Sequence, residues 1–267
     1  MHSAHPQVLR RQTQRGFTLI ELMIALLIGV FLLGALLTIV QANKQVFVGQ
    51  NLAAQLQDDE RMAMTMMTDV IESAGYYTNP YLNSNPFTTP TLSFNLTGAG
   101  ATPWPSPLQF ISGIYNAAPP GDQITVLTWT DTLPPNGSAS EANILNCSGL
   151  GNQTGGPLAV AETFEVLNGQ LICIMNGTQY TLVGDANVSV HSLNVLYGVK
   201  TSATAGNNVD TYMTATQVGT LPNPWTQVIS VLVTLTFTNP AYATGQGPQY
   251  VSIQRVIGLM NQTGPVI

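Results

Sequence analysis

Hydrophobic residues are concentrated in one long run near the amino terminus. From Phe17 to Val40 nearly every residue is apolar, and Glu21 is the one charged residue in the range. A helix of these 24 residues is roughly 36 Å long, against a hydrocarbon thickness of about 30 Å for a bilayer. The pattern therefore predicts a membrane-spanning helix over 17–40, and it places a carboxylate where a charge is costly.

The helical pattern continues beyond Val40, but with one apolar face instead of apolar residues all round. Residues 41–75 contain no proline, and their apolar positions recur at steps of three, four or seven: Val48, Leu52, Leu56, Ala63, Met67, Val70 and Ala74. Gly75 and Pro80 predict the end of the helix. We expect one helix over 17–74, bent or locally unwound at Gly29, Gly34 and Gly49, whose amphipathic half, 41–75, covers a sheet.

Alternating apolar and polar residues predict strands in the remaining head, 76–267. The β-rich segments are 122–130, 170–175, 179–184, 188–199, 228–238 and 250–260. An Asn-Gly-Thr connection predicts a hairpin between the second and third of them, and a slip in the alternation near His191 predicts a bulge. Proline, asparagine and glycine predict mostly loops over 76–123. The expected fold class is α+β, a long helix packed on an antiparallel sheet.

Charge adds an orientation to this picture. The chain is 45% hydrophobic and only 7% charged, with a net charge of −6. Three of its seven basic residues, Arg10, Arg11 and Arg15, precede the apolar run, whereas all 13 acidic residues follow Phe17. Basic residues are retained on the cytoplasmic side, so the carboxyl-terminal head is expected outside the cytoplasm. The acidic balance argues against direct nucleic-acid binding, which needs clustered Lys and Arg.

The segment "RGFTLIELMIALLIG" resembles the class III signal of type IV prepilins and pseudopilins. The resemblance implies that a prepilin peptidase removes a leader, 1–16, by cutting after Gly16 and methylates the amine of Phe17. It also implies that Glu21 pairs with the terminal amine of a neighbouring subunit in a filament, which would offset the desolvation of both groups. A plain signal anchor, in which Glu21 snorkels or is protonated near the interface, is the alternative.

Three further segments resemble PilW-type minor pilins: "ERMAMTMMTDVIESAGYY", "HSLNVLYGVKTSATAGNNVDTYMTATQV" and "WTQVISVLVTLTF" with "QRVIGLMN". This resemblance implies a structural minor pilin that takes part in initiating a type IV pilus and is incorporated into it. Other minor pilins and the major pilin are the implied partners. The implied location is the bacterial inner membrane, with a single span and a periplasmic head, and then the pilus at the cell surface. A type II secretion pseudopilin and a ligand-binding adhesin are the alternatives.

Few side chains suggest further chemistry. Cys147 and Cys173 are expected to form a disulfide in an exported chain, with two buried free thiols as the alternative.

Glu162 and Glu165 lie three residues apart in a segment that looks like a loop, and His191 lies alone within a strand pattern. No common catalytic motif is present, so we expect no enzyme. Asp210 and nearby amides offer too few carboxylates for calcium, so no metal and no cofactor is expected.

Overall fold

The computed structural model describes residues 16–76, 109–130, 146–149, 158–175, 177–201, 208–244 and 247–260. It divides into two compact units, Met1–Gln50 and Asn51–Ile267. The elements in chain order are α1 (Leu19–Glu72), β1 (Ile111–Ile114), β2 (Gln123–Thr130), β3 (Leu158–Leu167), β4 (Gln170–Met175), β5 (Thr178–Val183), β6 (Val190–Val199), β7 (Thr211–Met213), α2 (Ala215–Val218), β8 (Val228–Thr238), η3 (Pro240–Thr244) and β9 (Tyr250–Gly258). This is the α+β class expected from the sequence.

Helix α1 is continuous over 54 residues. It passes through Gly29, Gly34 and Gly49 without interruption, so the helix is not unwound at these glycines. A glycine inside a helix costs only about 1 kcal/mol relative to alanine. The surrounding Leu, Ile, Ala and Gln residues favour the helix strongly enough to maintain it.

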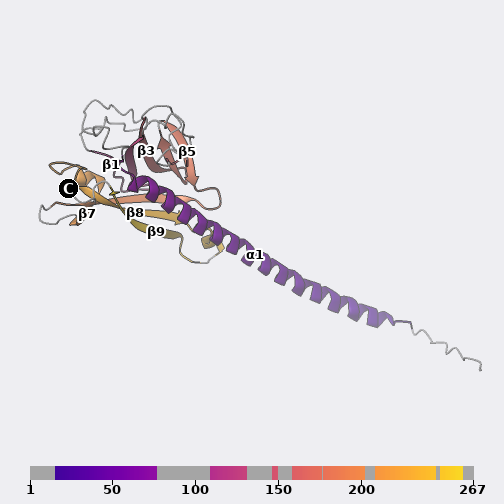
Figure 1. Cartoon of the computed structure of the whole chain (residues 1–267). Helices are drawn as coiled ribbons and strands as arrows, with labels where there is room; N and C mark the ends of the chain where they lie inside the picture. Colours follow the sequence, from indigo (N-terminus) through magenta and orange to yellow (C-terminus); the bar gives the residue numbers. More distant parts are fainter. Residues whose placement is uncertain are drawn as a thin grey trace, which may run out of the picture. The chain divides into compact units, whose positions relative to one another are not determined.

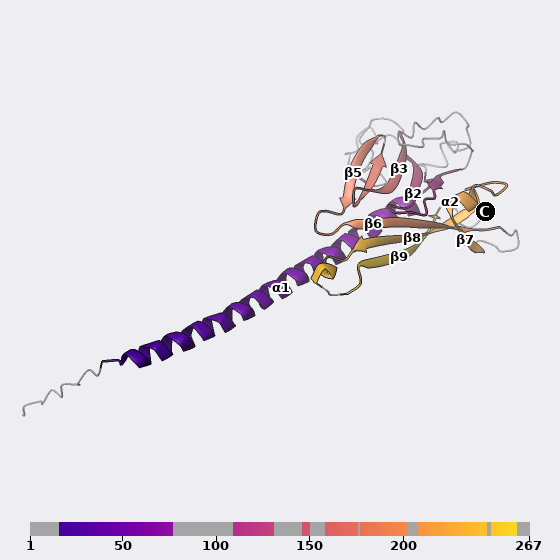
Figure 2. The ribbon, with the colours of Figure 1, turned by 180° about the vertical axis from the view of Figure 1, so that it is seen from behind.

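The strands form two antiparallel sheets instead of the single sheet expected (Figures 1 and 2). One has five strands in the order β1-β2-β3-β4-β5, and the other has four in the order β7-β6-β8-β9. The predicted hairpin is present as β4 and β5, and the predicted irregularity near His191 is a register shift between Val190 and Ser192. The sequence interpretation missed β1, which is only four residues long, and β3.

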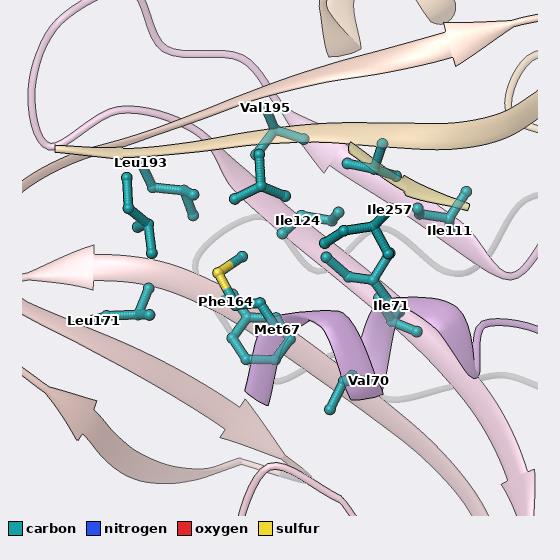
Figure 3. Close-up of a cluster of buried hydrophobic side chains, with 14 of the residues drawn as sticks. Met67, Val70, Ile71, Ile111, Ile124, Phe164, Leu171, Leu193, Val195 and Ile257 are labelled. Atoms are coloured by element: carbon teal, nitrogen blue, oxygen red, sulfur yellow. The ribbon is translucent and has the colours of Figure 1, made fainter. Parts of the chain in front are cut away.

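The carboxyl-terminal part of α1 packs in one hydrophobic core with strands of both sheets. Figure 3 shows Met67 and Ile71 of the helix beside Phe164 of β3, Ile124 of β2 and Ile257 of β9. Leu56, Ala63, Met67, Val70 and Ala74, all on the predicted stripe, are buried. Burial of a large apolar side chain contributes about 1.5–3 kcal/mol relative to exposure, so this stripe holds the helix to the head.

Strand β8 lies in the middle of the four-stranded sheet and follows its sequence pattern closely. Val231, Val233, Leu235 and Phe237 are fully buried, whereas Thr234, Thr236 and Thr238 are only half-buried. The alternation predicted from the sequence therefore sets which face of β8 meets the core.

Asp122 connects the two sheets through backbone hydrogen bonds. Its Oδ1 accepts from the backbone N–H of Asn116 at 2.8 Å, and its Oδ2 accepts from the N–H of Val195 in β6 at 2.8 Å. Its own N–H donates to the carbonyl of Leu193 at 2.7 Å. These three hydrogen bonds fix the approach of β6 to the chain before β2.

Gly121 makes that close approach possible, and replacing it should destabilise the head. The residue has a φ of +97°, and a Cβ atom there would lie 2.1 Å from the carbonyl oxygen of Leu193. We expect Gly121→Ala to lower the free energy of unfolding by about 2–3 kcal/mol in denaturant titrations. Gly258→Ala is the control, because no atom lies within 4 Å of its Cβ position. Equal stability of the two variants would contradict this role.

Candidate functional site

The candidate processing site lies immediately before helix α1. Gly16 and Phe17 are exposed and outside the helix, which begins at Leu19. Thr18 occupies the N-cap position, and its Oγ1 accepts a hydrogen bond from the N–H of Glu21 at 3.4 Å. A chain cut after Gly16 would thus carry its new amine at Phe17, two residues before the first turn of the helix.

Glu21 occupies the N3 position of α1, so it has a local structural role beside the one proposed from the sequence. The Thr18-x-x-Glu21 spacing is that of a capping box, in which a first-turn carboxylate also interacts favourably with the helix dipole. Among the residues that the structure describes, the recorded ion pair joins Arg61 to Asp58, and Glu21 has no salt-bridge partner. The helix dipole therefore favours a carboxylate at this position, and no basic side chain among the described residues forms a salt bridge with it.

The apolar run that follows is uncovered. Every large hydrophobic side chain from Phe17 to Val40 is more than half exposed, from 52% at Ile28 to 84% at Phe17. In length and composition, this part of α1 is able to cross a membrane. Exposed apolar surface of this extent marks a site that contacts lipid or other proteins. The run therefore needs a lipid or protein environment.

The second candidate site is the disulfide between Cys147 and Cys173, which the structure contains as the sequence predicted. Both residues are buried, and the bond fastens the described turn at 146–149 to β4. The carboxyl of Glu162 lies with the two sulfur atoms in a group whose ligand atoms are all within 4.8 Å of one another. Three side chains this close together could bind a metal ion if both cysteines were thiolates. Here the two sulfur atoms are joined in a disulfide, so they are not thiolate ligands.

Glu162 is on strand β3, and not in a loop as the sequence suggested. The side chain is 1% exposed, and its Oε1 accepts from the N–H of Cys147 at 2.5 Å. Its Oε2 is buried and has no hydrogen-bond partner in the described part of the chain. Glu165, three residues on, points to the opposite face and accepts from Gln123. The two carboxyls therefore do not form a catalytic pair.

Burial raises the pKa of Glu162 from 4.5 to about 7, while the hydrogen bond from Cys147 acts in the opposite direction. A carboxyl whose pKa is higher in the folded state holds its proton more tightly there. Its contribution to stability is complete below pH 4.5 and is lost as the pH rises through 7. The loss amounts to about 3 kcal/mol.

Glu162→Gln should remove most of this pH dependence. A glutamine retains the acceptor for Cys147 and cannot ionise, so between pH 4.5 and pH 8 the free energy of unfolding should fall by about 3 kcal/mol less in the variant than in the unaltered protein. Glu165→Gln, on the same strand, is the comparison. Burial also raises the pKa of Glu165, but its side chain is only half-buried, so this variant should reduce the slope less than Glu162→Gln does. A slope that is identical in the protein and in both variants would refute the assignment to Glu162.

The remaining residues considered from the sequence have structural surroundings. His191 stacks on Tyr250, with ring centroids 4.1 Å apart. Asp210 accepts from the N–H and the Oγ1 of Thr201 at 2.8 and 3.1 Å. Trp225 is buried against Tyr197 in an edge-to-face pair.

Sequence reasoning missed two features of these sites. The Thr18-x-x-Glu21 cap was detectable from its spacing alone. The burial of Glu162 had a weaker signal: in "LAVAETFEVL" this residue shares one face of a strand with Val160, Phe164 and Val166, which are buried.

Comparison with known proteins finds one sequence match, at the amino terminus. Residues 11–37 match the family model described as the prokaryotic N-terminal methylation motif. This motif implies processing by a prepilin peptidase. No curated protein matches the sequence of the chain.

One solved structure that the comparison matches is a type IV-like pilin from Thermus thermophilus. It is 9% identical in sequence, with a TM-score of 0.39, and the match covers 79% of this chain and 98% of that one. A similarity this low adds nothing to the argument about fold or function.

Proposed function

We propose that the chain is a minor pilin of the PilW type, which is processed between Gly16 and Phe17, helps to initiate a type IV pilus and is incorporated into it. The observation that carries the proposal is the methylation motif over 11–37, at the start of a helix with an uncovered apolar run. The second unit, with its disulfide, is the part that would contact neighbouring subunits in the periplasm and at the cell surface. Its function is structural, and no described side chain is needed as a catalyst.

The apolar run would first hold the precursor in the inner membrane and then pack among the helices of other subunits. Removal of the leader creates a cationic amine at Phe17, four residues from Glu21. In a filament, that amine of one subunit would neutralise the carboxylate of another, which makes transfer from lipid into the packed bundle favourable. The major pilin and other minor pilins are the proposed partners.

The first test is the amino terminus of the mature protein. In cells with a working prepilin peptidase, mass spectrometry should find a chain that begins at an N-methylated Phe17. In a strain that lacks the peptidase, the leader should remain attached. A chain that begins at Met1 in both strains would refute the proposal.

A deletion strain separates this proposal from its alternatives. Loss of surface pili with normal enzyme secretion supports the minor pilin. Loss of secreted enzymes with intact pili supports a pseudopilin of a type II secretion system, which would share the same amino-terminal motif. Intact pili and secretion with loss of attachment support an adhesin.

A further inference from the structure

Strand β9 is an exposed edge of the four-stranded sheet. Among the described residues its one neighbouring strand is β8, and both views of the ribbon place it on the outer side of that strand (Figures 1 and 2). Six of its nine residues are exposed. The other three edge strands, β1, β5 and β7, have four, six and three residues. The longest described edge is therefore the one at β9.

The hydrogen-bond register shows which backbone groups of β9 face outward. Leu259 donates to the carbonyl of Ile229, and at the other end Asn239 donates to the carbonyl of Gln249. In an antiparallel pair such hydrogen-bonded positions recur at every second residue. The odd-numbered residues of β9 are thus bonded to β8. The backbone N–H and C=O groups of Ser252, Gln254 and Val256 point toward the free edge.

This edge has few of the features that usually prevent strands from pairing with other chains. It has no proline, its register against β8 runs unbroken from Tyr250 to Gly258, and its nine residues include one charge. That charge, Arg255, lies opposite Val233 on the core side of the sheet, where its Nη1 bonds to Oγ1 of Thr68 in α1 at 3.1 Å. Natural proteins protect a long exposed edge with proline, bulges or charged residues, including charges that point inward. Of these devices β9 has only the inward charge of Arg255, which opposes any added strand that brings no acidic residue beside it.

The side chains on the core side of β9 indicate the sequence of that strand. Val251 and Ile253 pack on the core but are only partly buried, so their outer sides are left uncovered. Arg255 follows them on the same face and is exposed. An antiparallel strand added at this edge would form non-hydrogen-bonded pairs with the residues of β9 on this face. Side chains that lie opposite each other are closer in such pairs than in hydrogen-bonded pairs. Two apolar residues would cover Val251 and Ile253, and an acidic residue would pair with Arg255.

We propose that the free edge of β9 binds an extended segment of another protein with the pattern acidic-x-apolar-x-apolar, added as a fifth, antiparallel strand. Main-chain hydrogen bonds to Ser252, Gln254 and Val256 supply the affinity, and the pairing with Arg255 sets the register. The proposal goes beyond the function proposed above and does not depend on filament assembly.

A second copy of β9 does not fit this edge. The strand contains no Asp or Glu, so every self-pairing register leaves Arg255 of both copies without a carboxylate. One of these registers also places the two arginines directly opposite each other, which is destabilising. The partner is therefore a different segment that carries an acidic residue.

The test uses the full-length protein in detergent micelles and a capped synthetic peptide, TVTDTITVT, whose aspartate is designed to lie opposite Arg255. Hydrogen exchange resolved to single amides should show fast exchange at Ser252, Gln254 and Val256 in the protein alone. Saturating peptide should slow exchange at these three amides at least tenfold. The mass of the complex should correspond to one protein and one peptide. A doubled protein mass, together with protection of these three amides in the absence of peptide, would show self-pairing of β9 and overturn the assignment.

Two matched changes test the register and the hydrogen bonds. Replacing the aspartate of the peptide by lysine should weaken binding about fivefold, and Arg255→Glu should reverse this preference. Methylation of the backbone nitrogens of the fifth and seventh peptide residues, which face β9, should abolish binding. Methylation of the backbone nitrogens of the sixth and eighth residues, which point away from β9, should leave binding unchanged.

These peptide variants leave the protein unaltered, so folding does not affect the result. The proposal is overturned if the three amides of β9 are already protected without peptide. Equal binding of the aspartate and lysine peptides, or equal effects of the two methylation patterns, overturns it as well.

Discussion

Glu21→Ala should reduce the amount of this protein in sheared surface filaments at least tenfold, while the membrane pool remains processed at Phe17. The carboxylate lies in an apolar run, where an unpaired charge costs several kcal/mol. In the proposed filament it is neutralised by the Phe17 amine of a neighbour, and removal of one partner of a buried pair typically costs about 3–5 kcal/mol. Immunoblots of the filament and membrane fractions measure the ratio. A normal ratio in the variant would exclude an assembly role for Glu21.

Glu21→Gln distinguishes the charge from the helix cap. Thr18 caps α1 and Glu21 occupies N3, where glutamine is as acceptable as glutamate in a capping box. If the residue only starts the helix, the glutamine variant should assemble normally. We expect it to fail as the alanine variant does, because glutamine cannot neutralise the Phe17 amine. Thr18→Ala is the matched control, since it weakens the cap by about 1 kcal/mol and keeps the charge.

Replacement of both cysteines by alanine should lower the free energy of unfolding of the head by roughly 3.5 kcal/mol. The bond joins residues 26 positions apart, and the estimate follows from the chain entropy that such a loop removes from the unfolded state. Denaturant titration in detergent, followed by tryptophan fluorescence, measures the change. Unaltered stability would show that the bond does not restrain the head.

The same double variant should also have a weaker pH dependence. The disulfide holds the N–H of Cys147 against Oε1 of Glu162 and keeps the turn at 146–149 over that carboxyl. Without the bond, water should reach Glu162, and the pKa of its carboxyl should return toward 4.5. The loss of stability between pH 4.5 and pH 8 should therefore be smaller than in the oxidised protein. An undiminished loss would show that β3 alone buries Glu162.

The amino-terminal methylation motif was recognisable from the sequence because it depends on local order in the chain. Gly16, Phe17 and Glu21 were identified from a short motif and from the length of the apolar run that follows. Cys147 and Cys173 were the one possible pair, so only their proximity remained open. Strands β4, β6, β8 and β9 were recognised because their alternation has a period of two, and β8 showed it over its whole length.

The burial of Glu162 was not predictable, because its cause is remote from β3 in the sequence. The carboxyl is covered by the turn that Cys147 carries, and the local pattern around it resembles a loop. Short strands such as β1 have too few residues for alternation to be detected. The division of the strands into two sheets depends on contacts between segments far apart, such as the bonds from Asp122 to Val195 and to Asn116.

The sequence by itself determined where the apolar helix lies, where the processing motif is and which residues alternate, since composition and period are properties of neighbouring residues. The tertiary structure alone decided that β9 is an exposed edge, that Arg255 turns toward Thr68 and that Glu162 is enclosed beside a disulfide. These outcomes depend on which surfaces come together in space, because burial and hydrogen-bond pairing are set by distant parts of the chain.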